Sequence, residues 1–255
     1  EAECARGYGV DMTKTPSTSV SPPNVAAHAE VGVIGGSGFY TFLDNTEEVT
    51  LDTPFGTPSG PVVLGNLDNR RVAFLPRHGQ DHQFPPHRVN YRANLWALRA
   101  LGVRQVLAPC AVGSLRPGLV PGSLVIPDQI IDRTWGRPHT IFDVQGPVVH
   151  VEFADPYCPR GRKAIAITTQ EEHWPASTSG TLVVINGPRF SSRAESRFHA
   201  ALGADVVGMT GMPEAVLARE LALPYAAIAV VVNHAAGRGD SSRQVSMEGI
   251  TKVLE

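Results

Sequence analysis

Residues 186–220 read NGPRFSSRAESRFHAALGADVVGMTGMPEAVLARE, and each of two glycine-punctuated turns in this stretch leads into a segment of helix-like composition. The second turn follows a short apolar strand predicted for residues 205–208, so Met209, Thr210 and Glu214 come soon after that strand. In α/β proteins, ligands bind at the carboxyl ends of strands. A thioether beside a hydroxyl suits a ligand with one apolar and one polar face. The alternative is an ordinary core strand followed by a capped helix.

Alternating strands and helices are expected on both sides of this stretch. Residues 223–232, LPYAAIAVVV, form a continuous apolar run, as expected of a central strand that is covered on both faces. Residues 89–101 have helical apolar spacing that stops at Gly102. We therefore predict an α/β fold, a single domain with a central mixed, largely parallel β-sheet flanked by helices. The other expected strands are 31–36, 105–114, 123–132, 181–187 and a hairpin of 62–67 and 71–76 that turns at Asp68 and Asn69.

The chain has 255 residues, of which 42% are hydrophobic and 18% charged, as is typical of a globular protein. A formal net charge of −2 gives no electrostatic reason to expect a nucleic acid or an anionic membrane as partner. Cys4, Cys110 and Cys158 include no CxxC pair, which favours a reducing compartment, here the cytoplasm, over a disulfide scaffold. Residues 1–30 lack the pattern of a secretory signal. We expect a flexible N-terminal tail at residues 1–30 and the folded domain at residues 31–255.

A glycine-rich turn, GGSG at residues 35–38, follows the first predicted strand. Its backbone N–H groups can form an anion-binding nest, and Ser37 adds a hydroxyl donor. It is not a dinucleotide fingerprint, because Thr41 stands where the third glycine or alanine belongs. By itself the turn leaves anion binding and a plain tight turn as alternatives.

Arg77 and His78 follow the strand predicted at residues 71–76. Arginine can bind phosphate through two N–H groups, and histidine can donate to it. His82 and His87 come soon after, but the proline-rich sequence between them argues against the helical pairing of zinc ligands. We therefore expect an anion site here and no metal.

Small residues, CAVGS at 110–114, end the next strand and leave room for a flat ligand in the loop that they form. Cys110 acts as a nucleophile only with a nearby base and an activated thiolate, and a small buried cysteine is the commoner case. Asn233 follows the apolar run 223–232. Its amide can bind the edge of a heteroaromatic ring, or it can form a helix N-cap or a turn.

Taken together, these segments resemble the trimeric purine nucleoside phosphorylase superfamily, and most closely its methylthioadenosine phosphorylase branch. The resemblance runs from Val31 to about Leu254 and leaves the N-terminal tail outside. It implies a nucleoside phosphorylase-like fold. The motifs that carry it are IGGSG, DTPFGTPS, RHG, VNYRANLWAL, CAVGSL, DQIIDRT, HVEFADPYCP, GPRFSSRAES and GADVVGMTGMPEAVLARE.

The resemblance implies that inorganic phosphate is a co-substrate, that no cofactor or metal is required, and that a homotrimer has its active sites at subunit interfaces. His150 matches a histidine that reaches the 5′ pocket of the neighbouring subunit. Met209 would lie under the ribose, with Phe190 and Ala111 on the two sides of the purine. At the Cys110 position the branch usually has threonine, which is a better hydrogen-bond donor. The implied phosphate ligands are Ser37, Arg77, His78, Cys110, Ala111 and Thr210.

The base-recognition segment departs from the adenosine-cleaving pattern. Where that pattern has Thr-Asp and a second aspartate two residues on, this chain has Val232, Asn233 and Ala235. An asparagine amide donates hydrogen bonds to O6 and N7 of a 6-oxopurine, whereas an aspartate accepts from a 6-amino group or protonates N7. One residue points the other way: Ser191 stands where 6-oxopurine enzymes usually carry a glutamate, as in the methylthioadenosine branch.

The resemblance thus implies a pentosyltransferase that cleaves a purine nucleoside with phosphate to a free base and a ribose 1-phosphate. A 6-oxopurine substrate of the 5′-methylthioinosine or inosine/guanosine type is favoured, with Asn233, Arg77 and His78 as catalytic residues. The alternatives are an S-methyl-5′-thioadenosine phosphorylase that releases adenine and a nucleoside-binding protein with impaired catalysis. Cys110, the missing aspartate pair and the end of the sequence at Glu255 motivate the last of these.

Overall fold

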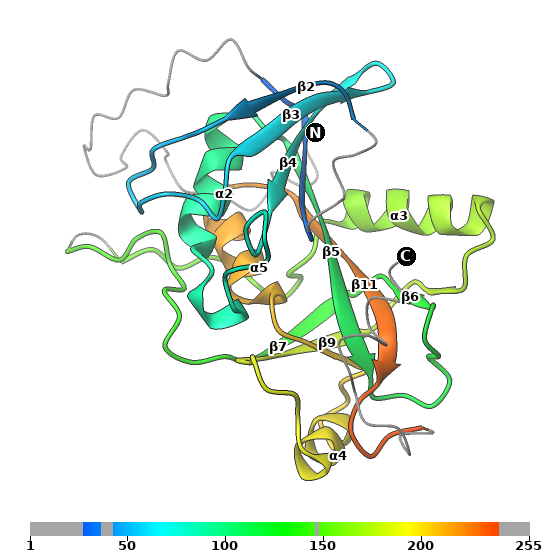
Figure 1. The fold of residues 1–255 in the computed structure, drawn as a ribbon. Coiled ribbons are helices and arrows are strands. Elements are labelled where there is room, and N and C mark those ends of the chain that lie inside the picture. Colours follow the sequence, from blue (N-terminus) through cyan, green and yellow to red (C-terminus); the bar gives the residue numbers. More distant parts are fainter. Residues whose placement is uncertain (1–27, 37–42, 146–147, 240–255) are drawn as a thin grey trace.

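Strand β5 (Gln105–Ser114) lies at the centre of the fold and pairs with three other strands (Figure 1). The computed structural model describes residues 28–36, 43–145 and 148–239. In it, β1 (Val31–Gly35) and β11 (Tyr225–His234) run parallel to β5, and β10 (Val206–Gly208) runs antiparallel to it. The eleven strands form one mixed, largely parallel sheet, so the predicted fold class is confirmed.

The main path of the sheet has the order β2-β3-β4-β1-β5-β10-β9-β7, while β11 pairs with β5 and β6, and β6 pairs with β8. The predicted hairpin is confirmed, because β3 and β4 are antiparallel, with Asp68 and Asn69 between them. The remaining strands are β2 (Asp44–Val49), β3 (Val62–Leu67), β4 (Arg70–Pro76), β6 (Leu124–Val125), β7 (Gln129–Arg133), β8 (Ala176–Ser177) and β9 (Thr181–Ile185).

Helices lie on both sides of this sheet (Figure 1). The helices α2 (Tyr91–Ala100) and α5 (Gly211–Glu220) pack against each other and share the largest hydrophobic core with the sheet. Helix α3 (Pro159–Glu171) packs against β11. A short 3-10 helix, η2 (Pro86–Arg88), precedes α2, and α4 (Arg193–Ala201) follows β9. In the described part of the chain, no helix is long and apolar enough to cross a membrane.

The structure refines several predicted boundaries. Helix α2 begins at Tyr91 because the Asn90 side chain accepts a hydrogen bond from the backbone of Ala93 and caps the first turn. The segment predicted as one strand at 123–132 is two strands, with Pro127 in the gap between them, where no ladder N–H is available. Strands β2 and β8 and helix α3 were not predicted.

The small residues at 110–114 do not form a loop, as the sequence suggested, because they continue strand β5 to Ser114. At the N-terminal end, Ala29 is buried, and Glu30 exchanges backbone hydrogen bonds with Arg71 and Arg104, although both residues lie in the predicted tail. The rest of that tail lies outside the described residues.

Candidate active site

The site is built where β1 and β5 diverge. Their pairing ends at Val33 and Leu107, and β10 joins the same edge of β5 only at Gly113. No described strand covers the edge of β5 between those two points. The Arg77 side chain enters this wedge and donates to Ile34 O of β1 at 2.8 Å and to Pro109 O of β5 at 3.0 Å.

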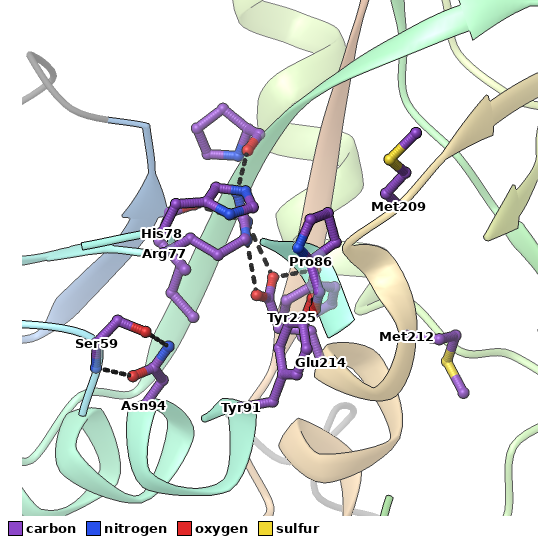
Figure 2. Close-up of polar contacts among 12 residues, drawn as sticks. Ser59, Arg77, His78, Pro86, Tyr91, Asn94, Met209, Met212, Glu214 and Tyr225 are labelled. Carbon is purple, nitrogen blue, oxygen red and sulfur yellow. Dashed lines mark hydrogen bonds and ion pairs between the residues drawn. The ribbon is translucent and has the colours of Figure 1, made fainter. Parts of the chain in front are cut away.

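Arg77 is held by a carboxylate that the sequence did not assign to it. Its Nε and Nη2 donate to the two oxygens of Glu214 on α5, at 2.8 and 3.0 Å, and the Tyr225 hydroxyl donates to the same carboxylate at 2.8 Å (Figure 2). All three side chains are buried. Burial alone lowers the pKa of Arg77, but the charge and hydrogen bonds of Glu214 raise it above its ordinary value.

The donors of Arg77 are therefore almost fully used. A guanidinium has five N–H groups, and the bonds to Glu214, Ile34 and Pro109 leave one on Nη1. In this arrangement Arg77 cannot bind phosphate through two N–H groups as the sequence led us to expect.

His78 lies beside Arg77, and its Nδ1 is 2.8 Å from the carbonyl oxygen of Phe84. A carbonyl only accepts, so Nδ1 carries the hydrogen and Nε2 has the free lone pair. Burial lowers the pKa of His78 to about 4. The hydrogen bond to Phe84 raises this pKa, whereas the charges of Arg77 and Arg137 lower it further. A neutral His78 can accept the hydrogen of a protonated phosphate oxygen.

The uncovered edge of β5 offers a backbone donor. Pro109 O faces this edge, because it accepts from Arg77, whereas Ser114 O faces β11 and accepts from Ala235. Backbone groups alternate between the two edges of a strand, so the N–H of Ala111 also faces the wedge. The predicted role of Ala111 in phosphate binding thus has a geometric basis within a strand rather than a loop.

Cys110 lies next to Ala111 and near the Arg77–Glu214 pair, whose charges both act on it. Burial raises the pKa of its thiol to about 11, so the thiol form dominates at neutral pH. This state fits a weak hydrogen-bond donor and does not fit an activated nucleophile.

Thr210 and Met209 follow β10 on the far side of the wedge. Thr210 is the buried N-cap of α5, yet its hydroxyl makes no capping hydrogen bond. A side chain at Gly187 would come within 2.6 Å of Met209 Sδ, so the turn that precedes Phe190 packs directly on Met209. The expected ribose residue and the expected base-stacking residue therefore belong to adjoining segments.

Near the C-terminal end of β5, Gly113 pairs with Asn233 of β11, next to a register shift in β11. A side chain at Gly113 would lie 3.4 Å from the Asn233 amide nitrogen and 3.6 Å from Cα of Ala235, so a glycine keeps this approach open. The Asn233 amide donates to the neighbouring His234 O at 2.7 Å. Ser191 Oγ is buried without a hydrogen-bond partner, and Phe190 is 42% exposed.

Two predicted residues remain to be placed. Ser37 lies outside the described residues, although Gly35, two positions earlier, accepts a hydrogen bond from the backbone of Arg77. His150 is exposed on the segment between β7 and α3. Its expected role in a neighbouring subunit stays a prediction.

Sequence reasoning missed Arg137, which is buried and donates to Met209 O at 2.9 Å and to Asn186 O at 2.8 Å. It also missed Tyr91, which accepts from Arg137 at 3.2 Å and donates to Pro86 O at 2.9 Å. Arg137 stands before a proline in an irregular segment, and no spacing pattern marks it. Tyr91 lies within one of the family-like motifs, but as one apolar position of a helix.

The motifs DTPFGTPS and VNYRANLWAL contribute hydrogen bonds that support the structure around the site. The backbone N–H of Ser59 donates to Asn94 Oδ1 at 2.8 Å, and Asn94 Nδ2 donates back to the Ser59 hydroxyl at 3.0 Å (Figure 2). One turn earlier, Asn90 Nδ2 donates to Phe55 O at 2.8 Å. These bonds fasten the DTPFGTPS segment to α2 beside the site.

Two histidines of the 78–87 segment lie close to one another. His78 and His82 stack with ring centroids 4.4 Å apart. Within the described residues, no three His, Cys, Asp or Glu side chains are grouped so as to hold a metal ion.

Comparison with known proteins places this geometry in a family. Residues 30–253 match the family described as Phosphorylase superfamily. The chain is 56% identical over 233 residues to a purine nucleoside phosphorylase of Streptomyces coelicolor, covering 89% of this chain and 83% of the relative. It is 58% identical over 208 residues to an S-methyl-5′-thioadenosine phosphorylase of Mycobacterium tuberculosis, covering 81% and 76%. It is 48% identical over 232 residues to a 6-oxopurine nucleoside phosphorylase of Pyrococcus furiosus, covering 88% and 86%.

Among solved structures, the chain is similar to methylthioadenosine phosphorylase from Schistosoma mansoni in complex with adenine, with a TM-score of 0.83 and 38% identity. The match covers 89% of this chain and 86% of the other. The resemblance that the sequence motifs indicated is thus confirmed. The chain belongs to the phosphorylase superfamily.

Proposed function

We propose that this protein cleaves a purine nucleoside with inorganic phosphate and prefers a 6-oxopurine, of the 5′-methylthioinosine or inosine/guanosine type. The relatives bear out the reaction class, phosphorolysis by a pentosyltransferase. The observation that carries the proposal is the uncovered edge of β5, where Arg77, His78 and the Ala111 N–H converge. Asn233 lies on the neighbouring strand β11, where it pairs with Gly113 further along β5.

Phosphate is itself the nucleophile in this reaction. The remaining Arg77 N–H, the Ala111 N–H and the Thr210 hydroxyl would donate to its oxygens, and His78 Nε2 would accept from a protonated oxygen. These groups are held before the substrate arrives, so they lower the entropic and electrostatic parts of the barrier without reorganising. Met209 would support the ribose, whose oxocarbenium-like character the bound anion stabilises.

Asn233 would act on the departing base. As a hydrogen-bond donor to O6 and N7 it stabilises the negative charge that develops on the purine. It must first exchange its hydrogen bond to His234 O for one to the base. An amide donates hydrogen bonds without giving up a proton, which suits a 6-oxopurine better than adenine.

A second candidate is an S-methyl-5′-thioadenosine phosphorylase. It is favoured by Ser191, whose buried hydroxyl has no partner in the structure and is free to bind a base. Relatives with 58% identity also carry that name. The two candidate functions differ in whether Asn233 or Ser191 dominates recognition of the substituent at position 6 of the purine.

A homotrimer and a cytoplasmic location are further parts of the proposal. The segment that carries His150 exposes large apolar side chains: Trp135 is 75% exposed, Val144 63% and Val148 81%. Exposed apolar surface of this kind is typical of a subunit interface. Light scattering coupled to size exclusion should give three times the mass of one chain, and a monomeric mass would contradict this assembly.

The proposed function is tested by incubating the protein with inosine, guanosine, adenosine, 5′-methylthioinosine and 5′-methylthioadenosine, each with and without inorganic phosphate. We expect release of the free base only with phosphate, together with a ribose 1-phosphate. Base release at the same rate without phosphate would indicate hydrolysis and overturn the proposal. Nucleoside binding without turnover would favour the impaired-enzyme alternative.

A further inference from the structure

Arg137 connects main-chain segments that come from different parts of the sequence. Its guanidinium donates to Met209 O at 2.9 Å, Met212 O at 2.5 Å, Asn186 O at 2.8 Å and the Tyr91 hydroxyl at 3.2 Å. The residue is 5% exposed. It follows β7 at one end of the main strand path and reaches the ends of both β9 and β10.

Each of these contacts leads to a residue of the proposed site. The Met209 carbonyl precedes Thr210, and Asn186 begins the turn that leads to Phe190. Tyr91 passes the connection on, because its hydroxyl donates to Pro86 O in the segment whose Phe84 carbonyl orients His78. One side chain thus fixes the relative positions of the phosphate, ribose and base segments.

The charge of Arg137 is also distinctive. Glu214 compensates Arg77 through two hydrogen bonds, and His78 is neutral at pH 7. Among the described residues, no carboxylate forms an ion pair with Arg137, and its charge is felt at His78. Arginine stays protonated even when buried. Arg137 is therefore a buried cation without an ion-pair partner in the described part of the chain; the charges of Asp132 and Glu214 act on it only at longer range, and burial still lowers its pKa.

We propose that Arg137 is a positioning residue of the nucleoside phosphorylase site, and that its charge, rather than that of Arg77, supplies the attraction for inorganic phosphate. The inference rests on the proposed function. Arg137 acts through the Met209 and Asn186 segments and through its field, without touching the substrate. A preorganised cation and fixed donors act more strongly in a site from which water is excluded.

The test separates the charge of Arg137 from its hydrogen bonds. Arg137→Gln removes the charge and most donors. Arg137→Lys keeps the charge but replaces the planar fork of five N–H groups by a point charge. The matched control is Arg162→Gln on α3, because Arg162 also donates to two main-chain carbonyls, Pro127 O at 3.0 Å and Thr178 O at 2.8 Å, away from the site.

For Arg137→Gln we expect KM for phosphate to rise about tenfold, which corresponds to about 1.4 kcal/mol of lost interaction, with a fall in kcat. Arg137→Lys should keep KM for phosphate within about threefold of the wild type while kcat still falls about tenfold, because the charge remains and the fixed segments loosen. Arg162→Gln should lower the melting temperature and leave KM for phosphate unchanged.

Calorimetric titration with inorganic phosphate gives the same comparison without turnover. If Arg137→Gln binds phosphate as the wild type does, or if Arg137→Lys binds it no better than Arg137→Gln, the inference is wrong. If Arg137→Gln does not fold, Arg137→Lys decides alone, since an unchanged kcat would contradict the positioning role. Failure of the proposed function is recognised separately, as an absence of phosphate-dependent base release by the wild-type protein.

Discussion

At the proposed phosphate end of the candidate site, Arg77 places four of its five N–H groups on Glu214, Ile34 and Pro109, and His78 is fixed by Phe84. The proposed base end, with Phe190, Ser191 and Asn233, is built differently. Ser191 Oγ has no partner, Phe190 is 42% exposed, and the Asn233 amide bonds only to the carbonyl of the next residue. Side chains whose hydrogen-bonding groups have partners within the protein are held in place. The side chains at the base end have few such partners, so their hydrogen-bonding groups are available to a ligand.

This difference explains how one framework can serve several bases. Phosphate is the same co-substrate for every nucleoside. A buried hydrogen-bond network that fixes the phosphate site therefore does not restrict which purine base can bind. The 6-position of the purine varies, and the side chains that meet it can change without disturbing the buried pairs. Relatives of this chain are accordingly named both for 6-oxopurine nucleosides and for methylthioadenosine.

The largest effect should come from breaking the phosphate end. Glu214→Gln leaves Arg77 as a buried cation without its carboxylate, and removal of one partner of a buried pair costs about 3–5 kcal/mol. Urea unfolding should show this loss of stability. Glu195→Gln is the control, because Glu195 pairs with Arg189 at the surface. Equal shifts for both variants would mean that the buried pair has no special role.

At the base end, Asn233→Ala should lower kcat on inosine-type substrates by at least about tenfold, because one preorganised donor is typically worth about 3 kcal/mol in the transition state. Little change in the free energy of unfolding is expected, since the Asn233 amide bonds only to its neighbour. Steady-state rates and urea unfolding check the two halves of this prediction. Unchanged turnover would remove Asn233 from the mechanism.

The pH dependence of stability should identify His78. Its pKa is about 4 in the folded protein against 6.5 ordinarily, so the unfolded chain binds more protons between these values. Stability is therefore full above pH 6.5 and falls by about 1–3 kcal/mol as the pH drops toward 4. Urea unfolding at several pH values should show a shallower fall for His78→Gln. Burial also lowers the pKa of His199, so part of the slope remains.

The smallest effect concerns Cys110. A threonine hydroxyl is a better donor than a thiol, and one hydrogen bond is worth about 0.5–1.5 kcal/mol. Cys110→Thr should therefore lower KM for phosphate by about two- to tenfold. Cys110→Val has the shape of threonine without its hydroxyl and should give no gain. If both variants change KM alike, packing rather than hydrogen bonding is responsible.

Local patterns were sufficient to predict most of the fold. Apolar runs marked β5, β9 and β11, and the turn at Asp68 and Asn69 marked the hairpin. Strand β2 was not predicted because its sequence, DNTEEV, is polar and its side chains are largely exposed. Helix α3 escaped because few of its side chains are buried, so its apolar spacing is weak.

For the candidate site, strand ends led to the predictions of Arg77, His78, Thr210 and Asn233, whose roles stay predictions. The partners of these residues were not visible, because Arg77 and Glu214 are 137 positions apart and nothing local links them. Arg137 was missed for the same reason. Only the folded structure shows which N–H groups of an arginine remain available to a ligand.

We propose that Asn233 at the base end selects a 6-oxopurine, while the phosphate end binds and orients the nucleophile. The most direct test offers the wild-type protein equal concentrations of 5′-methylthioinosine and 5′-methylthioadenosine with phosphate, and follows hypoxanthine and adenine in the same sample. We predict that hypoxanthine is released faster. Faster release of adenine would contradict the claim and favour an S-methyl-5′-thioadenosine phosphorylase.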